Sequence, residues 1–183
     1  MQILTTPHPF LKHKAKTLTV WDKKTAKEVK EMEAILKKTV NPKGVGLAAT
    51  QVGLDKRLFI LLDEASQTTK VFVNPEILEM SKKMIAAVYK KKKDRWLEGC
   101  LSIPKIWGFV DRPYSIKLKY FIPKQLDGKW VLSEQIVDYK DVESAYVQHE
   151  IDHLNGILFT DRILEQHGQM LRETEDGLSP ISL

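Results

Sequence analysis

The motif His149-Glu150-Ile151-Asp152-His153 constrains this chain most, because it ties a helix to a chemical task. Histidines four positions apart lie one turn apart on the same helix face, so both imidazoles can reach one metal ion. Glu150 stands next to the first histidine, close enough to take a proton from water at that metal. Val142 and Tyr146 continue the same helical stripe, so we expect this face to be buried. The sequence therefore predicts a metal-binding helix with an internal, catalytic face.

The third metal ligand is best supplied by Cys100, the single cysteine of the chain. Gly99 beside it allows a close backbone approach to a ligand. A thiolate with two imidazoles suits zinc or ferrous iron and leaves the fourth position open for water. His167 is a weaker candidate because it lies in a polar stretch, and spacing alone does not exclude Glu165, the type of ligand that another zincin class uses. A zincin-type metallopeptidase is therefore the alternative enzyme class.

The glycine-rich segment from Gly44 to Ala49 formally matches a dinucleotide-binding fingerprint. Its context argues against a nucleotide cofactor, because a predicted helix precedes it and a predicted strand follows it, the reverse of the Rossmann order. We instead expect its two glycines to let a substrate backbone run close by. Gln51 would then offer an amide N–H to a carbonyl oxygen of that substrate.

The remaining pattern predicts an α+β fold with a mostly antiparallel sheet. Helices are expected at residues 23–39, with Asp22 as N-cap and Asn41-Pro42 as the stop, at 142–153, ending near Gly156, and at 162–171. Strands are expected at residues 58–62, 70–73, 85–89, 116–120 and 130–137, with a hairpin turn at Asp127-Gly128. We expect one domain over residues 1–183, in which about 165–183 forms the end of the last helix and a tail.

Three motifs follow one another along the chain and together resemble those of the peptide deformylase family. They are GVGLAATQ from Gly44 to Gln51, EGCLS from Glu98 to Ser102 and QHEIDHLNG from Gln148 to Gly156. The resemblance extends from about Ile3 to about Leu164. It implies mostly antiparallel sheets packed around a central HExxH helix. It also implies an enzyme that removes the N-formyl group from the N-terminal formylmethionine of nascent polypeptides and releases formate.

The resemblance further implies a role for each matching residue in catalysis. One divalent metal ion, usually Fe²⁺, is bound in this family by residues that correspond to Cys100, His149 and His153. Zn²⁺, Ni²⁺ or Co²⁺ suit the same donors. Glu150 resembles the family's general base and acid. Gln51 and the backbone N–H of Leu101 resemble the donors that stabilise the oxyanion.

Substrate binding is expected to involve the glycine-rich segment and the helix stripe. The resemblance implies that the backbone of Gly46 pairs with the substrate as a neighbouring strand would. The apolar pocket for the methionine side chain is expected to be lined by Val45, Val142 and Tyr146. Asp152 points away from the ligand stripe, so we expect a structural role for it, either paired with Arg112 or solvated.

The rest of the chain gives expectations about its location and partners. With one cysteine, no signal peptide and no apolar run of membrane-spanning length, we expect a cytoplasmic monomer that does not enter a membrane. Some family members dock on the ribosome through a basic C-terminal helix, but acidic residues prevail over 161–183. The run Lys90–Lys93 is the remaining candidate for a transient ribosome contact, against a merely solvated run. A non-catalytic adaptor that binds ribosomal RNA is the third function class.

Overall fold

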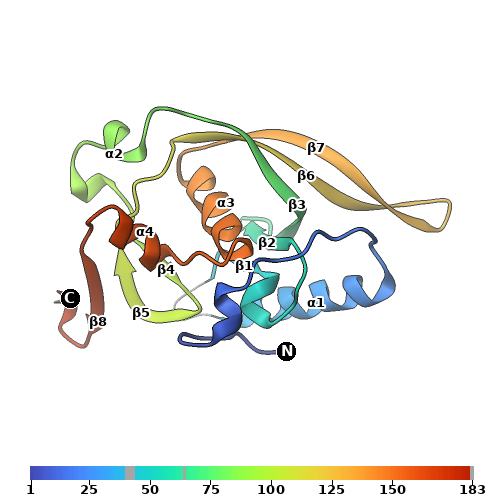
Figure 1. Cartoon of the computed structure of the whole chain (residues 1–183), viewed down its shortest axis with the longest axis horizontal. Helices are drawn as coiled ribbons and strands as arrows, with labels where there is room; N and C mark the ends of the chain where they lie inside the picture. Colours follow the sequence, from blue (N-terminus) through green and yellow to red (C-terminus); the bar gives the residue numbers. More distant parts are fainter. Residues whose placement is uncertain (40–43, 64, 182–183) are drawn as a thin grey trace.

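The structure is a computed structural model that describes residues 1–39, 44–63 and 65–181. It contains two antiparallel sheets, and the helix over Asp141–Leu154 lies near the centre of the molecule (Figure 1). The larger sheet has the strand order β1-β2-β3-β6-β7, and the smaller has the order β4-β5-β8-β9. The helix α3 (Asp141–Leu154) packs against β1, β2, β6 and β7 and carries the HExxH motif. The predicted α+β class with a central HExxH helix is therefore confirmed.

The strands of the larger sheet are β1 (Gly46–Ala48), β2 (Leu58–Asp63), β3 (Thr68–Met80), β6 (Ser115–Leu126) and β7 (Lys129–Lys140). Those of the smaller sheet are β4 (Glu98–Cys100), β5 (Ile103–Gly108), β8 (Met170–Thr174) and β9 (Gly177–Pro180). The other helices are α1 (Lys23–Lys38), α2 (Ile85–Val88) and α4 (Phe159–Glu165), with short 3₁₀ turns η1 (Pro9–Lys12), η2 (Ala49–Val52) and η3 (Lys92–Asp94). Among these described helices, none is long and apolar enough to cross a membrane.

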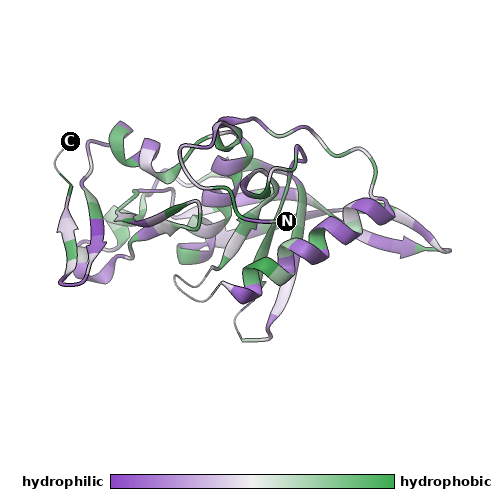
Figure 2. Ribbon diagram, turned by 90° about the horizontal axis from the view of Figure 1, so that it is seen from below, coloured by the Kyte–Doolittle hydropathy of each residue, from purple (hydrophilic) through white to green (hydrophobic). Residues whose placement is uncertain are grey.

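Helix α1 forms where its amphipathic pattern predicts it. The side chains of Val29, Met32 and Leu36 recur at helical spacing and are buried against β1 and β2. Hydrophobic and hydrophilic residues alternate along α1 in Figure 2. Asp22 is the N-cap as predicted, because its carboxylate accepts a 2.7 Å hydrogen bond from the N–H of Thr25. The predicted stop at Asn41-Pro42 lies outside the described residues.

The strand predicted at residues 70–73 is longer than expected, because β3 continues through Asn74-Pro75. Asn74 has a φ of 49°, and its side-chain amide makes two 2.8 Å hydrogen bonds to the backbone of Leu18. The register of β3 against β6 shifts between Val73 and Glu76. Asn74 and Pro75 thus form a bulge and do not end the strand. The bulge interrupts the ladder at Pro75, where the residue has no N–H to donate.

The prediction of a strand at residues 85–89 is wrong, because this segment forms the short helix α2. A short apolar run does not distinguish a strand from a buried helical turn. Distant side chains hold the turn in place. The N–H of Ala86 donates to Asp111 Oδ1 at 2.8 Å, and the Arg95 guanidinium donates to the carbonyls of Tyr89 and Ala86 at 2.6 and 3.1 Å.

The prediction that the last helix extends to residue 171 is also wrong. Helix α4 ends at Glu165, and residues 170–180 form the hairpin β8–β9. His167 adopts a φ of 52°, and the N–H of Gly168 bonds to the carbonyl of Ile163 at 2.8 Å, which closes the helix. β8 then pairs with β5. Over the described residues 165–181, the expected helix end and tail are therefore replaced by the hairpin β8–β9, which extends the smaller sheet.

The hairpin of β6 and β7 confirms the turn predicted at Asp127-Gly128. Both residues have positive φ, 48° and 74°, as a two-residue hairpin turn of the type I′ class requires. Both strands are longer than predicted and remain paired from Ser115 and Lys140 to the turn. Their tip extends away from the molecule, at the end opposite to β8 (Figure 1). The strand predicted at 58–62 is confirmed as β2.

Candidate active site

Helix α3 brings three of the predicted site residues to one place. His149 and His153 lie one turn apart, with their ring centroids 4.9 Å from each other. Glu150 lies beside them and is buried. The helix ends at Leu154, and Gly156 follows with a φ of 72°, the left-handed conformation expected just after a helix end.

Strand β4 supplies the third ligand candidate, Cys100, from the smaller sheet. Its Sγ lies 3.1 Å from Nε2 of His153. Ligand atoms of Cys100, His149 and His153 all lie within 4.8 Å of one another, a separation that one ion can bridge. One sulfur and two imidazole nitrogens are donors that zinc and ferrous iron accept. These residues therefore fit a divalent metal ion.

The other two ligand candidates do not join this cluster. Glu165 is exposed at the end of α4, where it pairs with Arg162 at 3.1 Å. His167 is an exposed residue just beyond the same helix. Both lie on the surface, because α4 directs its buried face, with Phe159 and Ile163, toward the core.

Opposing effects set the ionisation of the ligand candidates. Burial by itself raises the pKa of the Cys100 thiol, but the neighbouring His153 and His149 together hold that pKa well below its usual value. Burial lowers the pKa of His149, but Cys100 and Glu98 raise it well above its usual value. The site thus favours a thiolate, the form of cysteine that binds metals.

Glu150 directly follows His149 in sequence, and its environment suits proton transfer. Burial raises its pKa to about 7, despite the neighbouring histidines. Its Oε2 is buried and has no hydrogen-bond partner among the described residues. A Cβ at Gly46 would lie 2.4 Å from its Oε1 and 2.8 Å from Leu61 Cδ2, so a larger residue there would require this carboxylate and Leu61 to shift. Glu150 can therefore gain and lose a proton near neutral pH.

Gln51, on η2, points its amide group toward the same site. Its Oε1 accepts a 2.8 Å hydrogen bond from the N–H of Ala48, which fixes the orientation of the amide. Its Nε2 faces Cys100 Sγ at 3.4 Å and Ser102 Oγ at 3.2 Å. Gln51 therefore presents its amide N–H groups toward the ligand cluster.

A buried network of charged side chains orients the ring of His149. Its Nδ1 lies 3.0 Å from Oε2 of Glu98, and Glu98 makes two hydrogen bonds to Arg112, at 2.5 and 2.9 Å. Arg112 also binds Asp152 at 2.8 Å, which confirms the predicted pair. Burial alone would raise the pKa of Glu98, but Arg112 and His149 lower it to about 2. Sequence reasoning gave Glu98 no role, although it shares a strand face with Cys100 two residues later.

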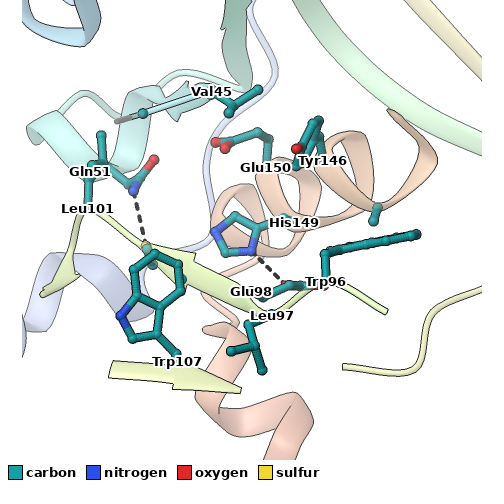
Figure 3. Close-up of a pocket in the computed structure, with 15 residues that line it drawn as sticks. Val45, Gln51, Trp96, Leu97, Glu98, Leu101, Trp107, Tyr146, His149 and Glu150 are labelled. Carbon is teal, nitrogen blue, oxygen red and sulfur yellow. Dashed lines mark hydrogen bonds and ion pairs between the residues drawn. The ribbon is translucent and has the colours of Figure 1, made fainter. Parts of the chain in front are cut away.

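A cavity of about 180 Å³ opens next to these groups (Figure 3). Val45 and Tyr146 line it, together with Gly46, Gln51 and Leu101. Val142 does not line this cavity but a neighbouring one of about 710 Å³, which Val45 and Tyr146 line as well. The sequence did not indicate three further apolar lining residues, Trp96, Leu97 and Trp107.

The fold and the site together define a class: hydrolases with an HExxH helix beside a buried cysteine, a set of donors that fits a divalent metal ion. The family model described as polypeptide deformylase matches residues 1–169, and the chain belongs to the peptide deformylase family. Enzymes of this family remove the formyl group from nascent chains, and this chain is an enzyme of that kind.

Two curated relatives and one solved structure match this chain over most of its length. Peptide deformylase of Natranaerobius thermophilus is 34% identical over 164 residues, which cover 90% of this chain and 92% of that protein. Peptide deformylase 1 of Bacillus subtilis is 34% identical over 178 residues, or 97% and 95% of the two chains. The crystal structure of peptide deformylase from Thermotoga maritima matches with a TM-score of 0.68 and 32% identity, covering 88% of this chain and 95% of that one.

Proposed function

We propose that this deformylase acts on formylmethionyl nascent polypeptides through one divalent metal ion held by Cys100, His149 and His153. The observation that carries the proposal is the convergence of these three donors within 4.8 Å, beside the buried Glu150. Fe²⁺ is the ion that we propose first, and Zn²⁺, Ni²⁺ and Co²⁺ suit the same donors. Bound there, such an ion supplies Lewis acidity that lowers the pKa of water and polarises the formyl carbonyl.

Glu150 moves the proton in the proposed reaction. Its carboxylate accepts a proton from the attacking water and then delivers this proton to the amine nitrogen as the C–N bond breaks. A pKa of about 7 suits both transfers at neutral pH, because neither protonation state is strongly disfavoured. The products are formate and a polypeptide with a free N-terminal amine.

Two N–H donors stabilise the negative charge that grows on the formyl oxygen. We assign them to the side-chain amide of Gln51 and the backbone N–H of Leu101. The hydrogen bond between Ala48 and Gln51 Oε1 supports this assignment, because it orients the amide before substrate arrives. Donors that are already in place stabilise a transition state more than donors that must first reorganise.

The substrate backbone pairs with Gly46 at the outer edge of β1, in the manner of an added strand. β1 is an edge strand, since β2 is its only partner among the strands that the structure describes. The methionine side chain packs against the apolar wall that Val45 and Tyr146 form, and Val142 borders the adjoining cavity.

We place the enzyme in the cytoplasm, where nascent chains are made, as a monomer with a single domain over residues 1–183. A transient ribosome contact through Lys90–Lys93 is part of this proposal. The exposed side chains of Lys91 and Lys93 support it. Such a contact depends on charge, so it weakens as the salt concentration rises.

Metal content tests the ligand assignment against the zincin alternative. After purification without oxygen, the wild type is expected to hold about one ion per chain, and Cys100→Ala to lose most of it. The matched controls His167→Ala and Glu165→Ala are expected to keep full metal content. Full loading of Cys100→Ala would overturn the assignment, and loss of metal in either control would favour a zincin ligand set.

A further inference from the structure

Trp107 connects the active-site cavity with the C-terminal hairpin β8–β9. Its indole lines the cavity (Figure 3). Its six-membered ring lies over Gly99, because a Cβ at that residue would be 2.6 Å from Trp107 Cζ3. At its other end, the indole N–H donates a 2.8 Å hydrogen bond to Oε2 of Glu173. One side chain therefore touches both the strand that carries Cys100 and the hairpin.

The hairpin is built so that Glu173 reaches this indole. β8 pairs with β5, and Trp107 stands opposite Leu171. Glu173 is two residues further along β8, so it shares the face of Leu171 and is a diagonal neighbour of Trp107. β9 pairs with β8, and the N–H of Ile181 bonds to the carbonyl of Met170 at 2.9 Å. The hairpin begins just beyond residue 169, where the match to the family model ends.

The position of Trp107 indicates which part of a substrate it meets. Successive side chains of a strand-like peptide point in opposite directions. Val45 and Tyr146 lie across the cavity from Trp107 (Figure 3). When the methionine side chain points toward Val45 and Tyr146, the side chain of the next residue points toward the indole.

We propose that Glu173 is a positioning residue that holds the indole of Trp107 as an apolar wall for the residue after formylmethionine. The inference rests on the proposed function. Aromatic and aliphatic side chains gain contact area on an indole face, whereas glycine gains none. A fixed indole also avoids the entropy loss of ordering that side chain when substrate binds. Loss of the hydrogen bond should therefore raise KM and leave kcat almost unchanged.

Formate release from two peptides, formyl-Met-Phe and formyl-Met-Gly, tests this role. For Glu173→Ala we expect KM for formyl-Met-Phe to rise about three- to tenfold, the range of one lost hydrogen bond. Its kcat and its KM for formyl-Met-Gly should stay at wild-type values. Glu173→Gln keeps an acceptor for the indole N–H and should restore the low KM. Glu175→Ala, an exposed carboxylate of the same hairpin, is the matched control and should behave as wild type.

Trp107→Phe provides a second, independent variant, because it keeps an aromatic ring but lacks the N–H. It should raise KM for formyl-Met-Phe to a similar extent. The double variant, with Glu173→Ala and Trp107→Phe, should then have a KM for formyl-Met-Phe no higher than that of either single variant, since both substitutions remove the same interaction. Metal content should be unchanged in all of these proteins.

If the wild type releases formate normally, any of three results would overturn the inference. These are an unchanged KM for formyl-Met-Phe in Glu173→Ala, an equal rise of KM for both peptides, and a loss that falls mainly on kcat. A metal-loaded wild type that releases no formate from either peptide would instead overturn the proposed function, and the inference with it.

Discussion

At the scale of single residues, Glu98 and Glu150 are two buried carboxylates with opposite ionisation. Arg112 and His149 keep the pKa of Glu98 near 2, whereas burial raises that of Glu150 to about 7. Glu98 is thus a fixed negative charge behind His149, and Glu150 is a group that can exchange a proton. The HExxH spacing predicted the role of Glu150. It did not reveal Glu98, because a residue that orients a ligand has no fixed spacing from it in sequence.

We predict that Glu150→Gln retains its metal but loses kcat by about 10²–10⁴-fold, because glutamine cannot accept the proton of the attacking water. Metal analysis and formate release, measured on the same sample, check this. An unchanged kcat in fully loaded protein would remove Glu150 from the proposed mechanism.

We predict that Glu98→Gln weakens metal binding by about 10–100-fold, as is usual when the partner of a ligating histidine is altered. Competition with a chelator of known affinity measures this loss. Glu79→Gln is the matched control, because Glu79 forms an exposed ion pair with Lys117, away from the site. Equal metal affinity in the Glu98 variant and the wild type would contradict the supporting role of Glu98.

At the scale of elements, patterns that repeat over several turns were predictable, whereas short apolar runs gave the right element at β2 and the wrong one at α2. Helices α1 and α3 follow from side chains repeated over several turns, and β2 follows from a continuous apolar run. The helix α2 has four residues, too few to show a period, and tertiary hydrogen bonds decide its conformation. The hairpin β8–β9 forms on the edge of β5, so its pairing depends on a partner distant in sequence. Local patterns contain no information about such a partner.

The N-cap of α1 provides a prediction at this scale. Asp22→Ala should lower the free energy of unfolding by about 1 kcal/mol, because the Thr25 N–H loses its acceptor. Asp22→Ser keeps an oxygen for that N–H and should recover most of the loss. Urea unfolding of both variants measures the difference, and equal stability of Asp22→Ala and wild type would contradict the capping role.

At the scale of the whole molecule, the active site exists only where three parts of the chain meet. Cys100 comes from the smaller sheet, the histidines come from α3, and Gln51 comes from the turn after β1. The motifs predicted that these residues belong together. The wall of the cavity was not predictable in the same way: Trp96 and Trp107 stand outside the motifs, and Val142 lines the adjoining cavity.

The contact of Asp55 with the N-terminal segment should weaken at acid pH. Asp55, before β2, accepts hydrogen bonds from His13 at 2.7 Å and from the N–H of Lys16 at 3.0 Å. The Lys16 side chain contributes most to the lowering of its pKa from 3.8 to about 2. Because the pKa is lower in the folded state, this carboxylate stabilises the fold above pH 3.8, and the stabilisation is lost as the pH falls toward 2.

The difference in unfolding free energy between wild type and Asp55→Asn should therefore shrink over that range. It should be about 1 kcal/mol or less at neutral pH, as is usual for ion pairs near the surface. Unfolding curves at a series of pH values measure it. A difference that stays constant from pH 5 to pH 2 would show that the ionisation of Asp55 does not contribute.

The central claim is that Cys100, His149 and His153 hold a metal for hydrolysis of an N-terminal formamide. The most direct measurement is a count of the products formed from a formyl-Met peptide by metal-loaded protein purified without oxygen. We expect one formate and one free N-terminal amine per peptide, with every internal peptide bond intact. Absence of formate from fully loaded protein, or cleavage within the peptide instead, would contradict the account.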